Sequence, residues 1–216
     1  MIDSMNELSG CIASGSTGSL TVVASRPAFA PEKTASQLAG LIAETEKKEL
    51  YVFSFFQLAK VWDDLSIGLT PTIVDSLELM DISLLKKALM KDSVVVIDYL
   101  QLLVMNQKLR SRREEELAIL GELKDLAYQI RTHVVVPFHL NRGFADNEGG
   151  KPLLTGNRLS ANDQLCKELV DRSDCVLLLW RKHDCYRNIG VAYEYNLEGP
   201  LVVRGLCKKQ EVLLME

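Results

Sequence analysis

Four consecutive aliphatic residues followed by an acid constrain the fold of this chain more than any other stretch. Residues 94–97 read Val-Val-Val-Ile, and Asp98 follows them directly. An unbroken apolar run of this kind is typical of a strand that is buried on both faces, as in a parallel sheet covered by helices. A chain of 216 residues is long enough to build one such domain and too short to favour two.

Other short apolar runs alternate with stretches of helical periodicity along the whole chain. Strands are expected at 20–24, 50–53, 71–74, 93–98, 132–138 and 175–180, and helices at 34–45, 82–89, 113–131 and 161–170. Asp81 is a candidate N-cap for the second of these helices. Residues 143–156 are rich in glycine and polar residues and predict an exposed loop, whereas 191–215 predict two or three short strands at an antiparallel edge. Together these units predict one α/β domain over residues 1–216, with a mostly parallel central sheet flanked by helices.

The composition excludes several classes of protein. A hydrophobic fraction of 47% is that of a globular chain rather than a disordered one, and a net charge of −4 argues against general coating of a polyanion. The cysteines are odd in number and form no C-x-x-C pair, so we expect reduced, buried thiols rather than a disulfide framework or a zinc site. They are Cys11, Cys166, Cys175, Cys185 and Cys207. No signal peptide or membrane span is recognisable, and we expect a cytoplasmic protein.

In open α/β sheets, ligands bind beyond the carboxyl ends of the strands, and the first such place here is 25–34. A strand, a loop, Lys33-Thr34 and a helix form the layout of a P-loop, which cradles nucleotide phosphates. However, no glycine lies between Ser25 and Thr34, Pro31 removes a donor N–H, and Glu32 puts a negative charge where phosphates would sit. An ordinary strand–helix connection therefore explains these residues equally well.

Two more polar residues follow predicted strands. Asp98 stands where a carboxylate commonly holds Mg²⁺ beside a triphosphate, and its alternative is a buried acid at a strand end. His139 could sense a γ-phosphate, and its alternative is a partly buried, hydrogen-bonded histidine.

These places also carry a family resemblance. Val96-Ile97-Asp98-Tyr99-Leu100-Gln101-Leu102-Leu103 closely resembles the second nucleotide motif of DnaB-type bacterial replicative DNA helicases. Ala24-Ser25-Arg26-Pro27 is similar to the start of that family's P-loop, and Leu140-Asn141-Arg142 matches its leucine-asparagine-arginine, with His139 where glutamine is usual. Further similar segments lie at 7–10, 18–20, 115–116, 123–127, 151–154 and 170–174. The resemblance implies the family's C-terminal ATPase domain, a RecA-like P-loop NTPase sandwich, over nearly the whole chain.

The resemblance also implies roles for individual residues. The nucleotide-binding set is Arg26, Lys33, Thr34, Asp98 and His139, of which Thr34 and Asp98 would hold Mg²⁺. The DNA-binding set, from two loops, is Arg112, Arg113, Arg142, Lys151 and Arg158. The candidates for reaching a neighbouring subunit's γ-phosphate are Arg204, Lys208 and Lys209. The alternative for the basic residues is that they are solvated surface charges.

Departures from the family pattern bear on whether the domain hydrolyses ATP. The family's second strand ends in a glutamate that polarises the attacking water, but the corresponding stretch here reaches Phe56 and Gln57 without a carboxylate, so no residue is identified as catalytic. The glycine of the P-loop is replaced, and the family's primase-contacting N-terminal domain is expected to be absent.

We therefore predict a DnaB helicase-like domain of DNA replication or processing with weak or no ATP hydrolysis. The alternative is an active ATP-dependent motor that binds MgATP and single-stranded DNA within a ring, and a minor third is a RecA-like fold in unrelated use. If the nucleotide site functions, the expected cofactors are ATP and Mg²⁺. If it does not, no cofactor is expected. The expected partners are single-stranded DNA, further copies in a ring or a helicase-related protein, and no membrane.

Overall fold

A computed structural model gives the arrangement of the chain. It describes residues 2, 4–14, 17–25, 31–55, 70–107, 109–140, 161–180, 183–189, 192–197, 202–208 and 210–215. All statements about the structure concern these ranges.

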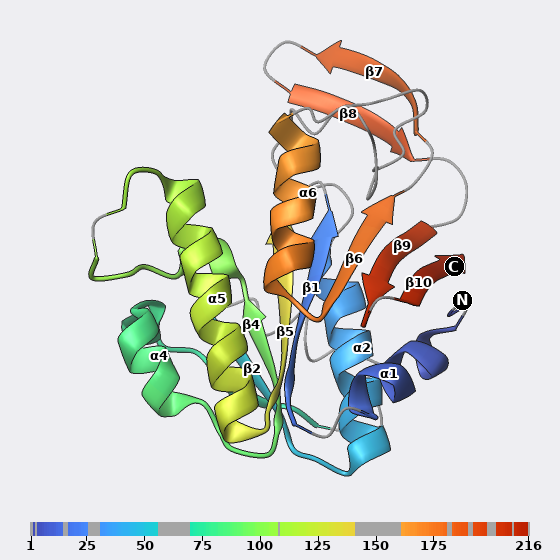
Figure 1. Cartoon of the computed structure of the whole chain (residues 1–216). Coiled ribbons are helices and arrows are strands. Elements are labelled where there is room, and N and C mark those ends of the chain that lie inside the picture. Colours follow the sequence, from blue (N-terminus) through green and yellow to red (C-terminus); the bar gives the residue numbers. More distant parts are fainter. Residues whose placement is uncertain are drawn as a thin grey trace.

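An eight-stranded sheet forms the centre of the molecule, with the strand order β10-β9-β6-β1-β5-β4-β2-β3 (Figure 1). Its strands are β1 (Ser19–Ser25), β2 (Leu50–Ser54), β3 (Thr72–Val74), β4 (Val94–Asp98), β5 (His133–His139), β6 (Cys175–Trp180), β9 (Val202–Cys207) and β10 (Gln210–Met215). Strands β1 to β6 run parallel, while β9 is antiparallel to both β6 and β10. The predicted mostly parallel sheet with an antiparallel edge is therefore confirmed.

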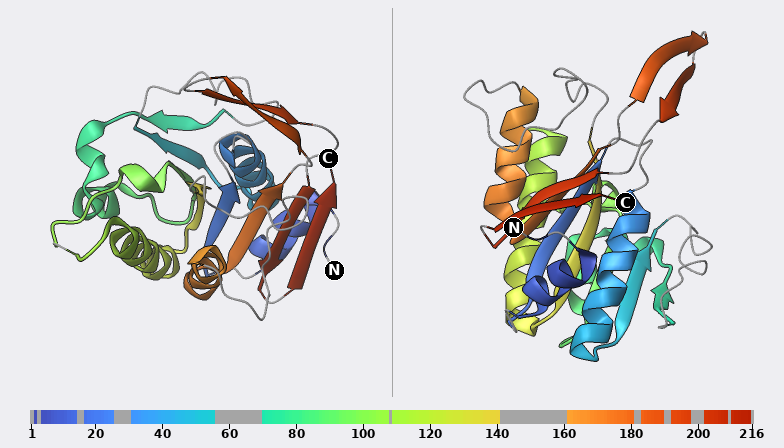
Figure 2. Two further views of the ribbon diagram at one scale, coloured as in Figure 1. Left: turned by 90° about the horizontal axis from the view of Figure 1, so that it is seen from above. Right: turned by 90° about the vertical axis from the view of Figure 1, so that its right-hand side faces the viewer.

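Helices cover both faces of this sheet, which makes the fold a three-layer sandwich (Figures 1 and 2). On one face lie α1 (Met5–Ala13) and α2 (Pro31–Glu46), and on the other lie α4 (Ile82–Ala88), α5 (Arg112–Ile130) and α6 (Ala161–Arg172). Two 3-10 helices, η2 (Leu77–Met80) and η3 (Leu100–Leu102), join α4 and α5 to the strands.

The run at residues 94–97 shows why both faces need cover. Successive side chains of a strand point to opposite faces, so Val94 and Val96 pack in the core beneath α1 and α2, whereas Val95 and Ile97 pack in the core beneath α4 and α5. All four side chains are fully buried. Because both faces of the strand are buried, its sequence does not alternate between apolar and polar residues.

Helix ends follow the expected capping chemistry. Asp81 caps α4, because its carboxylate accepts a hydrogen bond from the backbone N–H of Ser83 at 2.7 Å. Ser111 caps α5 by accepting from the N–H of Glu114 at 3.2 Å. Helix α5 ends at Arg131, whose left-handed conformation (φ 57°) turns the chain into β5.

Helix α1 and strand β7 were not predicted. Helix α1 begins at an N-cap, Ser4, which accepts from the N–H of Glu7, and it buries Leu8 and Ile12 against the sheet. Strand β7 (His183–Ile189) pairs antiparallel with β8 (Ala192–Leu197) in a separate two-stranded sheet beyond the carboxyl ends of the main strands (Figure 1). The predicted tail at 191–215 therefore contains three strands. Only β9 and β10 form the antiparallel edge of the main sheet, because β8 pairs with β7, a polar strand whose sequence has no apolar pattern. The loop expected at 143–156 lies outside the described residues.

Candidate functional site

The carboxyl ends of β1, β2, β4 and β5 bring polar side chains together at one edge of the sheet. Ser25 ends β1 beside His139, the last residue of β5, and Ser54 ends β2 beside Asp98, the last residue of β4. Ser25, Ser54 and Asp98 are almost completely buried. Because parallel strands end at the same edge, these groups share one place, which we call the carboxyl-end site.

A contact between a glutamate and a histidine crosses the carboxyl-end site. Helix α2 follows β1 and starts at this edge, so Glu32 in its first turn reaches the end of β5. The carboxylate of Glu32 lies 2.6 Å from Nε2 of His139, and the two side chains are only 15% and 24% exposed. The carboxylate of Glu32 is thus held beside the end of β5 by His139.

The residues after β4 surround His139. The ring of Tyr99 meets the imidazole edge-on, with centroids 5.2 Å apart, and Nε2 of Gln101 donates to the carbonyl of His139 at 3.0 Å. Within the described part of the chain, Nδ1 of His139 is buried without a hydrogen-bond partner, as are Oε1 of Gln101 and Oγ of Ser54. Such buried groups cost stability, which makes this edge the best candidate for a ligand.

Arg112 connects this edge to helix α5. Its guanidinium donates to the carbonyls of Gln101 and Leu103 at 2.7 and 2.6 Å, and it pairs with Glu115 at 2.6 Å. Arg113 pairs with Glu168 of α6 at 2.8 Å. Arg112 and Arg113, two of the residues predicted to bind DNA, therefore have partners within the chain, and their DNA contact stays a prediction.

The two predicted nucleotide ligands on α2 differ in placement. Lys33 is exposed, whereas Thr34 is buried beneath the first turn of the helix. The hydroxyl of Thr34 and the carboxylate of Asp98 are oxygen donors of the kind that Mg²⁺ prefers, so this half of the site fits the ion. The Glu32–His139 pair does not fit a triphosphate, because a carboxylate repels phosphate oxygens. The described side chains at this edge therefore divide into two oxygen donors that suit Mg²⁺ and one carboxylate that would repel a triphosphate.

Other predicted site residues fall elsewhere. Lys208 donates from Nζ to the carbonyls of Cys11 and Ile12 at 2.8 and 2.9 Å, so it caps the last turn of α1. Arg204 lies within β9. Residues outside the described part of the chain are Arg26, Phe56, Gln57, Arg142, Lys151, Arg158 and Lys209. The roles predicted for all of these stay predictions.

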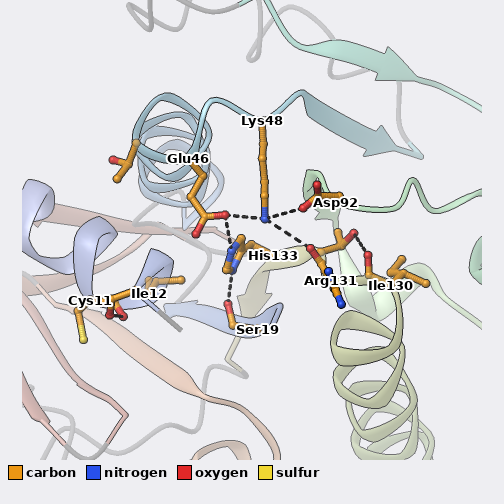
Figure 3. Close-up of polar contacts among 12 residues, drawn as sticks. Cys11, Ile12, Ser19, Glu46, Lys48, Asp92, Ile130, Arg131 and His133 are labelled. Atoms are coloured by element: carbon orange, nitrogen blue, oxygen red, sulfur yellow. Dashed lines mark hydrogen bonds and ion pairs between the residues drawn. The ribbon is translucent and has the colours of Figure 1, made fainter. Parts of the chain in front are cut away.

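A second polar cluster lies at the opposite edge of the sheet, where the strands begin (Figure 3). His133, the first residue of β5, contacts Oγ of Ser19 through Nδ1 at 2.8 Å and the carboxylate of Glu46 through Nε2 at 3.1 Å. Lys48 pairs with the same Glu46 and with Asp92. Burial of His133 lowers its pKa, although Glu46 acts in the opposite direction. We call this group the amino-end cluster.

Sequence reasoning missed the residues of the amino-end cluster and the contact between Glu32 and His139. A histidine at the head of an apolar run was the only local signal for His133. For Glu32, the charge was recognised, but its contact with His139 depends on the position of α2 over β5. No metal-binding group of three or more histidine, cysteine or acidic side chains occurs among the residues whose placement is described. In those same ranges, no helix is long and apolar enough to span a membrane.

Comparison with protein families gives one match. The model of the DnaB-like helicase C terminal domain matches residues 64–194, which is more than half of the chain. No curated protein matches the chain.

Comparison with solved structures gives the same kind of fold. The "ATPase Domain of G40P" superposes with a TM-score of 0.64 at 15% identity, over 93% of this chain and 80% of that one. "The Structure Of A DnaB-Like Replicative Helicase And Its Interactions With Primase" superposes with a TM-score of 0.56 at 16% identity, over 93% of this chain. The chain spans 56% of the length of that second structure. Identities this low show the fold alone, and the predicted RecA-like sandwich is confirmed.

Proposed function

Because this chain belongs to the DnaB-like helicase C-terminal domain family, we propose that it serves DNA replication or processing as a helicase-type domain with weak or no ATP hydrolysis. The observation that supports this proposal is the 2.6 Å contact between the carboxylate of Glu32 and Nε2 of His139. Family membership accounts for the RecA-like ATPase fold. The contact between Glu32 and His139 bears on a separate question, which is whether this fold still binds and hydrolyses ATP.

The contact between Glu32 and His139 acts against phosphate binding in two ways. A P-loop binds phosphate with backbone N–H groups at the start of a helix, where the helix dipole favours an anion. Glu32 already places an anion in this first turn, and the contact with His139 holds it at the end of β5. A nucleotide would have to displace the carboxylate and separate it from the imidazole.

The missing water-activating carboxylate acts in the same direction. Strand β2 ends at Ser54, and the following sequence up to Gln57 contains no acid. A general base contributes about 10²–10⁴-fold to a rate, so its loss alone would leave hydrolysis very slow.

An active motor is the second candidate, and the positions of Thr34 and Asp98 favour it. Both residues are buried at the places where the family resemblance puts its Mg²⁺ ligands. If MgATP binds despite Glu32, the domain would be an ATP-dependent DNA helicase motor with ATP and Mg²⁺ as cofactors.

We also propose the partners that family membership suggests. These are single-stranded DNA, bound through the basic loop residues, and either further copies of the chain in a ring or a helicase-related protein. The proposed location is the cytoplasm.

Calorimetric titration with MgATP and with a non-hydrolysable analogue tests the proposal. We expect no micromolar binding by the wild-type chain and measurable binding by Glu32→Gln, because that variant removes the charge but keeps the shape. Glu46→Gln is the matched control, since it neutralises a glutamate at the other end of the same helix and should leave nucleotide binding unchanged.

The opposite result would support the motor. If wild-type chain binds MgATP at micromolar concentration, Lys33→Ala abolishes that binding, and single-stranded DNA stimulates hydrolysis, the degenerate interpretation is wrong. Fluorescence anisotropy with a labelled oligonucleotide, at two salt concentrations, measures DNA binding independently of nucleotide, because phosphate contacts weaken as salt rises.

A further inference from the structure

Three cysteines from distant parts of the chain meet beneath helix α1. Cys175 begins β6, and Cys207 ends β9 directly beside it in the antiparallel register. Both are buried on the face of the sheet that α1 covers. Cys11 of α1 completes the group, with its Sγ 3.8 Å from Sγ of Cys207.

We propose that Cys11 and Cys207 form a reversible disulfide when the protein meets a small-molecule disulfide of the glutathione type. A sulfur–sulfur bond is about 2 Å long, so closing it requires the two atoms to approach by less than about 2 Å. This inference is independent of nucleotide or DNA binding.

Access distinguishes the two thiols. Cys11 is partly exposed on the last turns of α1, whereas Cys207 is fully buried. A small-molecule disulfide can therefore reach Cys11 first, and Cys207 can react only with a sulfur that is already bound at Cys11. This division of roles is that of an attacking and a resolving cysteine.

The surroundings of Cys207 suit the resolving role. A hydrogen bond from the thiol of Cys175 lowers the pKa of Cys207, and the contact with Cys11 and the ammonium of Lys208 act in the same direction. Burial raises the pKa of Cys11, so its reaction should be slow at neutral pH and faster in mild alkali. The same Lys208 holds the carbonyls of Cys11 and Ile12, which keeps the end of α1 over Cys207.

The chemistry proceeds in two exchanges. The thiolate of Cys11 attacks one sulfur of the small disulfide, which forms a mixed disulfide and releases one small thiolate. The thiolate of Cys207 then attacks the sulfur of Cys11, which forms the protein disulfide and releases the second small thiolate. The two protons of the cysteine thiols end on the two released thiols, and two electrons pass from the protein pair to the small disulfide.

Oxidation of the purified protein with oxidised glutathione at pH 8 tests the proposal. Free thiols are blocked with iodoacetamide, and unreduced peptides are mapped by mass spectrometry. We expect a peptide pair joined through Cys11 and Cys207 that disappears after reduction. Because the bond closes a very long loop, we expect oxidation to raise the Tm by about 5–10 °C, and dithiothreitol to reverse the rise.

Single variants separate the roles. Cys207→Ser should accumulate a glutathione adduct at Cys11, whereas Cys11→Ser should protect Cys207 from modification. Cys175→Ser replaces the thiol donor beside Cys207 with a hydroxyl, so it should still form the Cys11–Cys207 bond but at a changed rate. Circular dichroism confirms that each variant folds.

Three results would overturn the proposal. These are a disulfide that joins Cys207 to Cys175 instead, a wild-type chain that stops at the glutathione adduct, and an oxidised chain whose Tm is unchanged or lower. An absence of any reaction in the folded chain, under conditions that oxidise the chain in urea, would overturn it as well.

Discussion

Strand β5 begins with one histidine and ends with another, and each is paired with a glutamate of helix α2. At the amino end, His133 meets Glu46 at 3.1 Å, and at the carboxyl end, His139 meets Glu32 at 2.6 Å. The side chain of His133 is 1% exposed and that of His139 is 24% exposed. The same pair of residue types, on the same strand and helix, thus stands in two different environments.

The two pairs differ in how many of the polar atoms around them have hydrogen-bond partners. Both ring nitrogens of His133 have partners, because Ser19 contacts Nδ1 while Glu46 contacts Nε2. At the other edge, within the described ranges, Nδ1 of His139 lacks a partner and so does Oγ of Ser54 nearby. A saturated network holds structure together, whereas buried polar groups without partners reduce stability and are typical of sites that meet a ligand.

The largest effect is expected from removing the two histidines in turn. His133→Ala should lower the free energy of unfolding by about 2–4 kcal/mol, because it leaves a cavity and removes the partner of Ser19 and Glu46. His139→Ala should cost less than about 1 kcal/mol, since its contact with Glu32 is partly exposed to solvent. Urea unfolding of both variants at pH 7.5 measures the difference, and equal losses would contradict the contrast between the two edges.

Neutralising the two glutamates should give a smaller difference of the same sign. Glu46→Gln weakens contacts with both His133 and Lys48 and should cost about 1–2 kcal/mol. Glu32→Gln should change stability by less than about 1 kcal/mol, because it disturbs a single pair. The comparison uses the same urea assay, and a larger loss for Glu32→Gln would mean that the carboxyl-end pair is the structural one.

The amino-end cluster should also make stability depend on pH. Burial lowers the pKa of His133 in the folded chain below the ordinary value near 6.5, so the unfolded chain binds the additional proton first. Stability is therefore fully present above that value and falls as the pH drops below it. Unfolding curves between pH 5 and 8 should show this fall in the wild type and in His139→Gln, and a weaker fall in His133→Gln. An identical fall in His133→Gln would assign the effect to other groups.

The smallest effect is expected at the rim of the amino-end cluster. Asp92 pairs with Lys48 at 3.1 Å, but its side chain is 73% exposed, so solvent screens the pair. Asp92→Asn should change the free energy of unfolding by less than about 0.5 kcal/mol. A loss as large as that of Glu46→Gln would show that Lys48 depends on Asp92 for its position.

Much of the fold followed from local patterns. The apolar run at 94–97 predicted β4 and its two-sided burial, and Asp81 was recognised as the cap of α4 because a short acidic side chain accepts a backbone N–H two residues on. Helix α1 was missed, since its apolar face covers little more than Leu8 and Ile12 and its periodicity is short.

Residue types and their order along the chain were sufficient to predict the parallel sheet and the antiparallel edge, because hydrophobic periodicity, capping and strand ends are local properties. The family was predicted from the resemblance of short motifs. Which polar side chains and which thiols meet could not be predicted from such local properties. The contacts of Glu32 with His139, of Glu46 with His133 and of Cys11 with Cys207 join elements far apart in sequence. They depend on strand register and on how α1 and α2 pack across the sheet, and no local pattern encodes either.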